Sequence, residues 1–299
     1  MNKEASVQTL TDTMAKFTSY IGKHLPTDIT EKLAKLRAAE TNPLAMAVYT
    51  SMDENQKAAD KLDRPSCQDT GVIQYFIRAG AKFPLLGELE DILRNATLEA
   101  TRKSPLRHNA VETFDEKNTG TNTGTKAPWL DWEIVPEDDG ASIDVYMAGG
   151  GCTLPGSATV LMPGEGYEGV TQFVFDVITS RGVNACPPLL VGVGVSTAVE
   201  TAARLSKLAL MRPLGSRNAN ENAAKMENML EEGLNEIGIG PQGLTGNSSV
   251  MGVHIESSAR HPSTIGVAVS TGCWAHRRGK IRINSDLSYE IISHKGAVL

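Results

Sequence analysis

Residues 64–71 read Arg64-Pro65-Ser66-Cys67-Gln68-Asp69-Thr70-Gly71, and the interpretation of the whole chain starts from this stretch. Residues 67–70 place a thiol, an amide, a carboxylate and a hydroxyl side by side. Pro65 holds the residue before it extended, and Gly71 tolerates backbone angles that other residues avoid. We therefore expect a tight loop that presents reactive groups at the start of an apolar strand, 72–77.

The composition is that of an ordinary globular protein. Of the 299 residues, 40% are hydrophobic and 21% are charged, and the formal net charge is -6. A chain of this length can bury a large core, and no basic stripe suits nucleic acid or an anionic membrane. The longest apolar run is too short to span a bilayer, and the first residues lack the apolar segment of a secretory signal. We therefore expect a cytoplasmic protein whose thiols stay reduced.

The hydrophobic periodicity predicts a mixed α/β fold. Residues 1–62 form a helical region that packs on a sheet, because their apolar residues recur with helical spacing. The expected helices are 5–21, 28–39, 43–62, 85–104, 166–180, 197–211 and 220–237. The expected strands are 72–77, 129–135, 142–147, 189–195, 250–255 and 265–269, with a hairpin over 281–292.

Three local patterns make more specific predictions. Strands 129–135 and 142–147 alternate apolar and polar residues, and we expect them to pair through a turn at 138–140. The stretch Thr197-Ala198-Val199-Glu200 has the pattern of a capping box that begins a helix. The stretch Gly192-Val193-Gly194 resembles part of a dinucleotide fingerprint, but the third glycine is absent and no P-loop lysine follows, so we exclude nucleotide binding.

Two polar or glycine-rich segments are candidates for ligand binding. Residues 118–125 contain two Asn-Thr-Gly triplets, which are typical of turns. They form either a solvated loop or a loop whose amides and hydroxyls close over a small polar ligand. Gly149, Gly150 and Gly151 follow a predicted strand, where backbone N–H groups can approach an anion. A plain hinge fits these glycines equally well.

The four cysteines leave three interpretations open. Cys67, Cys152, Cys186 and Cys273 are far apart and lack the CxxC spacing of zinc ribbons and ferredoxins. They are buried packing residues, ligands of a Cys/His zinc site, or thiolates of a cluster that the fold assembles. A four-iron cluster with three cysteine ligands leaves one iron as a Lewis acid and needs arginines nearby to bind carboxylates. The available arginines are Arg107, Arg260, Arg277 and Arg278.

Five motifs resemble those of the iron–sulfur hydro-lyases, the class I fumarases and their relatives. They follow the family's order over nearly the whole chain, as Cys67-Gln68-Asp69-Thr70-Gly71, Leu106-Arg107-His108-Asn109, Asn184-Ala185-Cys186-Pro187-Pro188, Gly243-Leu244-Thr245-Gly246 and His261-Pro262-Ser263-Thr264. The resemblance implies one catalytic domain over 1–299, of the class I fumarase N-terminal type. Its helical N-terminal region would pack on mixed sheets around a buried iron–sulfur cluster.

The resemblance also implies which residues form the site. Matching the motifs assigns the ligands of a [4Fe-4S] cluster with one open iron to Cys67, Cys186 and Cys273, and leaves Cys152 over. In the family, the open iron takes the hydroxyl and a carboxylate of the substrate. Residues expected to bind substrate oxygens are Gln68, Arg107, Gly149, Gly150 and Gly151.

Two further residues are candidates for acid/base or orienting roles. Asp69 lies beside a cluster ligand, where a carboxylate can orient or activate a neighbouring hydroxyl. His261 suits a general acid because imidazole titrates near neutral pH. For His108, His254 and His276, a structural role is at least as well supported.

One departure from the fumarases bears on the substrate. Fumarases usually carry serine after the glycines, where this chain has Cys152 within the stretch 149–156. Together with 273–279, this stretch resembles the branch of the family that dehydrates L-tartrate to oxaloacetate through an enol. The family also uses a smaller swivelling domain, and we expect it on a separate β subunit in an α2β2 assembly. The alternatives are a fumarase-type subunit, against which the Cys152 stretch argues, and a non-catalytic scaffold or zinc-binding protein.

Overall fold

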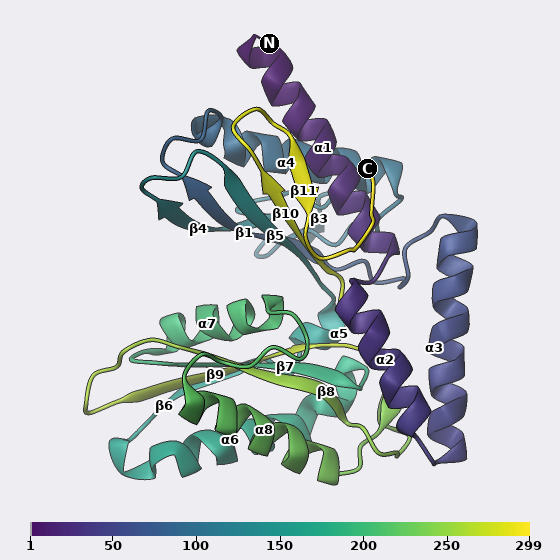
Figure 1. Cartoon of the computed structure of the whole chain (residues 1–299), viewed down its shortest axis with the longest axis vertical. Coiled ribbons are helices and arrows are strands. Elements are labelled where there is room, and N and C mark those ends of the chain that lie inside the picture. The colour runs from purple at the N-terminus through teal and green to yellow at the C-terminus, as the bar shows by residue number, and fades with distance from the viewer. Residues whose placement is uncertain (1) are drawn as a thin grey trace. The chain divides into compact units, whose positions relative to one another are not determined.

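A computed structural model describes residues 2–299 and divides them into two compact units, whose elements are labelled in Figure 1. The first unit comprises the described residues up to Thr27 together with Asn55–Gly149 and Arg277–Leu299. The second comprises Asp28–Glu54 and Gly150–His276. Each unit is therefore built from segments that are distant in sequence. Whether both act as the single catalytic domain expected over 1–299 stays a prediction.

The first unit is a mixed five-stranded sheet covered by helices. Its strand order is β11-β10-β5-β1-β4. The strands are β1 (Val72–Gly80), β4 (Trp129–Val135), β5 (Ala141–Ala148), β10 (Arg278–Ile283) and β11 (Tyr289–Ile291), beside a two-stranded ribbon of β2 (Val111–Glu112) and β3 (Lys117–Asn118). The long helices α1 (Lys3–Lys23) and α4 (Leu89–Lys103), the latter preceded by the short η1 (Leu86–Glu88), lie side by side and share one core with the sheet.

The second unit is a four-stranded sheet between helices. Its strand order is β6-β9-β7-β8, and helix α7 covers one face while α6 and α8 cover the other (Figure 1). The strands are β6 (Ser157–Leu161), β7 (Leu189–Ser196), β8 (Val250–Ser257) and β9 (Ile265–Gly272). Besides the helical segment 28–54, the helices of this unit are α5 (Gly150–Thr153), α6 (Gly166–Arg181), α7 (Val199–Met211) and α8 (Glu221–Glu236), with the short turns η2 (Pro163–Glu165), η3 (Gly182–Ala185) and η4 (Pro241–Gly243).

Strand β7 is the centre of the second unit. All of its residues are buried, and it runs parallel to β8 and antiparallel to β9. A Cβ atom at Gly194 would overlap the carbonyl oxygen of Ala202 in α7, and one at Gly192 would overlap that of Ser206. These two glycines therefore serve the close packing of a helix on the strand.

The helical N-terminal region is confirmed as α1, α2 (Thr27–Ala39) and α3 (Pro43–Leu62). Helix α1 begins where the Asn2 side chain accepts a hydrogen bond from Ala5 N at 2.8 Å. Its buried residues include Leu10, Met14 and Phe17, which are among those whose spacing predicted the helix. The remaining predicted helices and the C-terminal hairpin of β10 and β11 are also confirmed, with ends shifted by a few residues.

The predicted pairing of strands 129–135 and 142–147 is wrong. Both strands exist, as β4 and β5, but β1 lies between them and pairs parallel with β4 and antiparallel with β5. Strand β1 buries Ile73, Tyr75 and Ile77 on one face, and its other face includes Gln74 and the exposed Arg78. Its backbone forms long ladders with both β4 and β5, and these ladders take the place of the expected local hairpin.

The predicted capping box at 197–200 is also wrong. Helix α7 starts at Val199 with Ala198 at its N-cap position, and no side chain caps it. The Thr197 hydroxyl instead accepts a hydrogen bond from His261 N at 3.0 Å. The Thr197 side chain therefore forms a tertiary hydrogen bond and does not cap helix α7.

A buried carboxylate, that of Glu40, links two segments of the second unit through hydrogen bonds. It accepts hydrogen bonds from the backbone N–H groups of Thr41, Asn42 and Asn247, each at 2.9 Å. Burial alone would raise the pKa of Glu40, but the three N–H donors outweigh burial and lower it. The charge on Glu40 therefore stabilises the folded unit.

We expect Glu40→Gln to destabilise the protein by about 2 kcal/mol at pH 7, because the donors lose a charged acceptor. Because the folded pKa lies below the unfolded one, this contribution is complete above the ordinary pKa of glutamate. It is lost as the pH falls through the lowered value. Urea midpoints of the wild type, Glu40→Gln and the exposed control Glu54→Gln, measured at pH 7 and near pH 4, check this. An equal difference at both pH values would contradict it.

Candidate active site

The loop that carries Cys67 is rigidly held in the first unit. Ser66 N donates to Gly22 O at 3.2 Å, and Asn55 Nδ2 donates to Ser66 O at 2.8 Å. Gly71 has a φ of +85°, and a Cβ atom there would lie 2.8 Å from the backbone of Met147. Only glycine fits this close approach to β5. The predicted tight loop before β1 is thus confirmed, and it leaves Cys67 half-buried.

The loop 67–71 is joined to the segment that carries Arg107. Thr70 is buried, and its Oγ1 accepts a hydrogen bond from Arg107 N at 2.9 Å. Asn109 Nδ2 donates to Asp69 Oδ1 at 3.1 Å. Gln68, exposed, lies in the same loop, with its Oε1 3.5 Å from Cys67 Sγ. The structure therefore brings together three of the predicted site residues, Gln68, Asp69 and Arg107.

Arg107 is suited to bind an anion. Its side chain is exposed, and it has no carboxylate partner among residues 2–299. An arginine guanidinium binds a carboxylate through two parallel hydrogen bonds, and Asp69 on the neighbouring loop does not satisfy it. The first unit thus offers one cation, one amide and one carboxylate on adjoining loops.

The second unit brings the segments of Cys186 and Cys273 together. Trp274 N donates to Cys186 O at 3.1 Å, and Gln242 N donates to Pro187 O at 2.9 Å. Cys186 is exposed and adopts a left-handed conformation with φ of 55°. A non-glycine residue in this region is strained by about 1 kcal/mol or more, and such strain concentrates at functional sites. Both cysteines lie at the end of the sheet where β7 begins and β9 ends.

The glycine segment before Cys152 packs beside these two cysteines. Thr271 Oγ1 donates to Cys152 O at 2.6 Å, and a Cβ atom at Gly151 would lie 3.1 Å from Asn184 O. Gly149 ends the first unit, and Gly150 begins the single-turn helix α5. Their expected role in binding a carboxylate stays a prediction.

Cys152 differs from the other three cysteines. It is 5% exposed and belongs to the apolar core of the second unit. Burial lowers the pKa of the Lys207 ammonium, while a negative charge on Cys152 would raise it. The other three cysteines are exposed or half-buried.

The donor set fits an iron–sulfur cluster in its chemistry. Thiolates are the usual ligands of such clusters, and the three cysteines assigned by the motifs are the accessible ones. Within residues 2–299, neither unit by itself gathers three His, Cys, Asp or Glu side chains that could hold a metal ion. Cys67 lies in the first unit, whereas Cys186 and Cys273 lie in the second. Their joint role as cluster ligands stays a prediction.

The structure does not bring His261 to Cys186 and Cys273. His261 N binds Thr197, which follows the last residue of β7, whereas Cys186 precedes the first. The eight residues of β7 separate these ends by about 23 Å, at roughly 3.3 Å per residue. His261 is exposed, and its Nδ1 accepts a hydrogen bond from Ser263 N at 3.1 Å, so a neutral ring carries its proton on Nε2.

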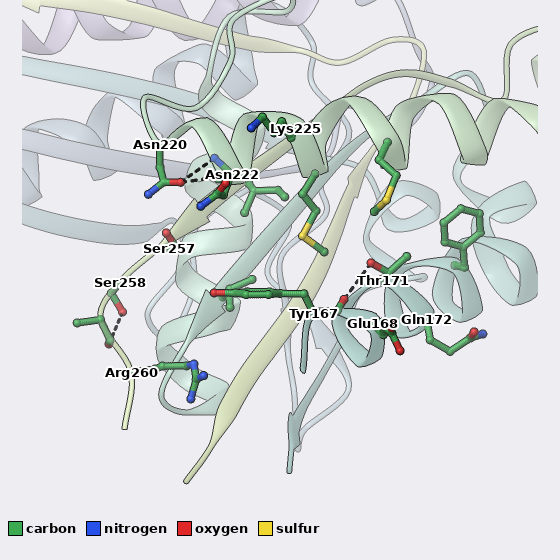
Figure 2. Close-up of a pocket in the computed structure, with 17 residues that line it drawn as sticks. Tyr167, Glu168, Thr171, Gln172, Asn220, Asn222, Lys225, Ser257, Ser258 and Arg260 are labelled. Carbon is green, nitrogen blue, oxygen red and sulfur yellow. Dashed lines mark hydrogen bonds between the residues drawn. The ribbon is translucent and has the colours of Figure 1, made fainter. Parts of the chain in front are cut away.

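A cavity of about 1050 Å³ lies at the same end of the sheet as His261 (Figure 2). Its walls come from α6, with Tyr167, and from α8, with Lys225, and its rim includes Arg260. Arg260 Nη1 donates to the carbonyl oxygens of its own loop, among them His261 O at 3.1 Å. This cavity is therefore distinct from the cysteine end of the unit.

The remaining histidine and arginine candidates of the 254–278 region are buried. His254 and His276 are buried, and their rings hydrogen-bond the carbonyl oxygens of Ala209 and Leu210 near the end of α7. Arg277 and Arg278 are 2% and 4% exposed. Sequence reasoning missed the role of Asn109, although it lies within a quoted motif, and that of the buried Asn122. An asparagine two residues after the expected substrate-binding Arg107 was the available signal.

The comparison with protein families agrees with the motifs. The chain matches the model of the fumarate hydratase (Fumerase) family over residues 11–282. The chain belongs to the fumarate hydratase family. The expected mixed α/β fold with a helical N-terminal region is therefore confirmed for this family member, and within residues 2–299 no helix is long and apolar enough to cross a membrane.

Curated relatives within the fumarate hydratase family cover almost the full chain. It is 61% identical over 298 residues to the L(+)-tartrate dehydratase subunit alpha of Escherichia coli strain UTI89, covering 100% of this chain and 98% of the relative. It is 60% identical, with the same coverage, to the protein of that name from strain K12. A putative L(+)-tartrate dehydratase subunit alpha of Methanocaldococcus jannaschii is 32% identical over 267 residues, which are 88% of this chain and 93% of the relative.

Proposed function

We propose that this chain is the α subunit of an L(+)-tartrate dehydratase, a hydro-lyase that converts L-tartrate to oxaloacetate and water. The observation that carries the proposal is the 61% identity over the full chain to an α subunit of that name. The reaction removes a hydroxyl group from one carbon and a proton from the next. The resulting enol then tautomerises to oxaloacetate.

Cys67, Cys186 and Cys273 hold a [4Fe-4S] cluster in this proposal. When bound, the cluster supplies an open iron that acts as a Lewis acid on the leaving hydroxyl. Cys186 is exposed and Cys67 and Cys273 are half-buried, whereas the fourth cysteine is buried in an apolar core, and this difference supports the assignment. The strained backbone at Cys186 and its hydrogen bond to the segment after Cys273 also support it.

The residues of the first unit bind and orient the substrate. Arg107 pairs with one carboxylate through its guanidinium, and Gln68 donates its amide N–H to a substrate oxygen. The N–H groups of the 149–151 segment donate hydrogen bonds to another carboxylate oxygen. Asp69 is held beside Arg107 and moves or orients a proton at its carboxylate.

The role expected for His261 is the least supported by the fold. Its separation from Cys186 and Cys273 along β7 argues against acid/base work at a cluster held by the same chain. The proposal therefore assigns the acid/base work of this chain to Asp69.

A β subunit completes the enzyme. The relatives are named as subunits alpha, which supports a partner chain, and we propose that it carries the smaller swivelling domain in an α2β2 assembly. The experiment is anaerobic purification of the chain with and without its β subunit, followed by detection of oxaloacetate formed from L-tartrate. Turnover is expected only for the pair. Full activity of the isolated chain would contradict the need for a partner.

A fumarate hydratase subunit is the second candidate function. The observation that favours it is the match to the fumarate hydratase family model over residues 11–282. The binding residues and the cluster ligands would be the same, because malate differs from tartrate by one hydroxyl group. The two candidates differ only in substrate preference.

A further inference from the structure

We propose that Asn109 is a positioning residue for Asp69, and that the segment 118–125 serves to hold Asn109 in place. This inference rests on the proposed function, because it requires Asp69 to act on the substrate. It assigns to the two Asn-Thr-Gly triplets a role that is neither a solvated loop nor a cover over a ligand. All the residues concerned lie in the first unit.

The Asn109 side chain fixes one oxygen of the Asp69 carboxylate. Asn109 Nδ2 donates to Asp69 Oδ1 and to Gly71 O, each at 3.1 Å. Gly71 N donates to the same Oδ1, also at 3.1 Å. Two donors from different directions set both the position and the rotation of the carboxylate. Asp69 thus meets the substrate in a fixed orientation.

Asn109 is in turn held by Asn122, which is 2% exposed. Asn122 Oδ1 accepts from Asn109 N at 3.0 Å, and Asn122 Nδ2 donates to Thr101 Oγ1 at 3.0 Å. Thr101 Oγ1 donates to Thr97 O in α4 at 2.7 Å. A series of hydrogen bonds therefore links the buried face of α4 to Asp69 through Asn122 and Asn109. Buried networks of this kind are rigid when their members are satisfied.

The alternating threonines explain why the segment repeats. The hydroxyls of Thr119, Thr121 and Thr123 follow one another at 3.1 and 3.2 Å. The backbone of the segment also pairs with Ala110, through Thr119 N to Ala110 O at 3.0 Å. The threonines at every second position thus stabilise the segment itself. The Asn122 side chain, between two of these threonines, is directed into the unit.

The expected consequence is a change in kcat rather than in KM. Asn109 does not bind the substrate in this proposal, so its loss leaves the affinity intact. A carboxylate displaced by about 1 Å costs on the order of 100-fold in rate. A residue that merely supports the fold would instead lower thermal stability and iron content along with the rate.

The experiment uses the anaerobic α and β complex with Asn109→Ala, Asp69→Asn and the double variant. The control is Asn95→Ala, an exposed asparagine of α4 in the same unit. We expect Asn109→Ala to lower kcat about 100-fold with KM within about twofold. Iron, sulfide and the melting temperature should match the control. The double variant should be no slower than Asp69→Asn alone, because Asn109 acts through Asp69.

Three results would overturn the inference or its basis. An unchanged kcat for Asn109→Ala, or a double variant slowed by the product of both effects, overturns the positioning role. Loss of iron or stability in step with kcat also overturns it. If Asn109→Ala does not fold, Asn109→Leu keeps the approximate size of the side chain and the backbone bond to Asn122, removes the amide donor, and should slow turnover equally. Full activity of Asp69→Asn would instead contradict the proposed role of Asp69.

Discussion

Cys273→Ser and Cys186→Ser are each expected to abolish turnover together with the cluster. Serine has the size of cysteine, but its hydroxyl stays protonated at neutral pH and does not replace a thiolate ligand. The matched control is Cys152→Ser, which changes a cysteine in the core of the same unit. The measurement is iron and sulfide per chain, with the visible absorbance of anaerobically purified protein.

A different pattern of iron content among the cysteine variants would contradict the ligand assignment. If Cys152→Ser loses its iron while Cys273→Ser keeps it, the ligand assignment is wrong. Absence of sulfide and visible absorbance in the wild type would favour a zinc-binding or non-catalytic protein. Neither result would change the family, which rests on the full-length comparisons.

Asp69→Asn is expected to lower kcat by about 10² to 10⁴, the usual contribution of general acid–base catalysis. The iron content should be unchanged, because asparagine has the same shape and its Oδ1 still accepts from Asn109 and Gly71. The measurement is kcat on L-tartrate alongside iron per chain. Loss of iron would make Asp69 structural, and full activity would remove it from the mechanism.

His261→Asn provides the comparison for Asp69. The fold separates His261 from Cys186 by the length of β7, so we expect a smaller effect on kcat than that of Asp69→Asn. The variant keeps the backbone N–H that binds Thr197, and the loop should stay in place. A loss as large as that of Asp69→Asn, with iron unchanged, would restore His261 as an acid/base residue.

Local pattern predicted most elements of the fold, because periodicity reports which faces are buried. It failed where a residue distant in sequence decides the outcome. Strand β1 pairs with both β4 and β5 and so lies between them, and the alternation within those two strands carries no information about this third strand. The Thr197 hydroxyl was taken by His261, 64 residues away.

In the candidate site, too, some features could be predicted from local sequence and others depend on contacts between distant residues. The Cys67 loop was predictable, because proline and glycine enclose four polar groups. The buried position of Cys152 and the hydrogen bond between Trp274 N and Cys186 O depend on tertiary packing. The role of Asn122 was hidden because asparagine in a polar tract usually marks a turn. Its burial shows only in the folded unit.

The most direct test of the central claim is a comparison of kcat/KM for L-tartrate, malate and fumarate on the anaerobic complex with the β subunit. We expect a strong preference for L-tartrate, with oxaloacetate as the product. A preference for malate or fumarate would contradict the tartrate assignment and make the chain a fumarase-type subunit with the same ligands. Absence of turnover on all three with a full cluster would mean that the substrate is a different hydroxy acid.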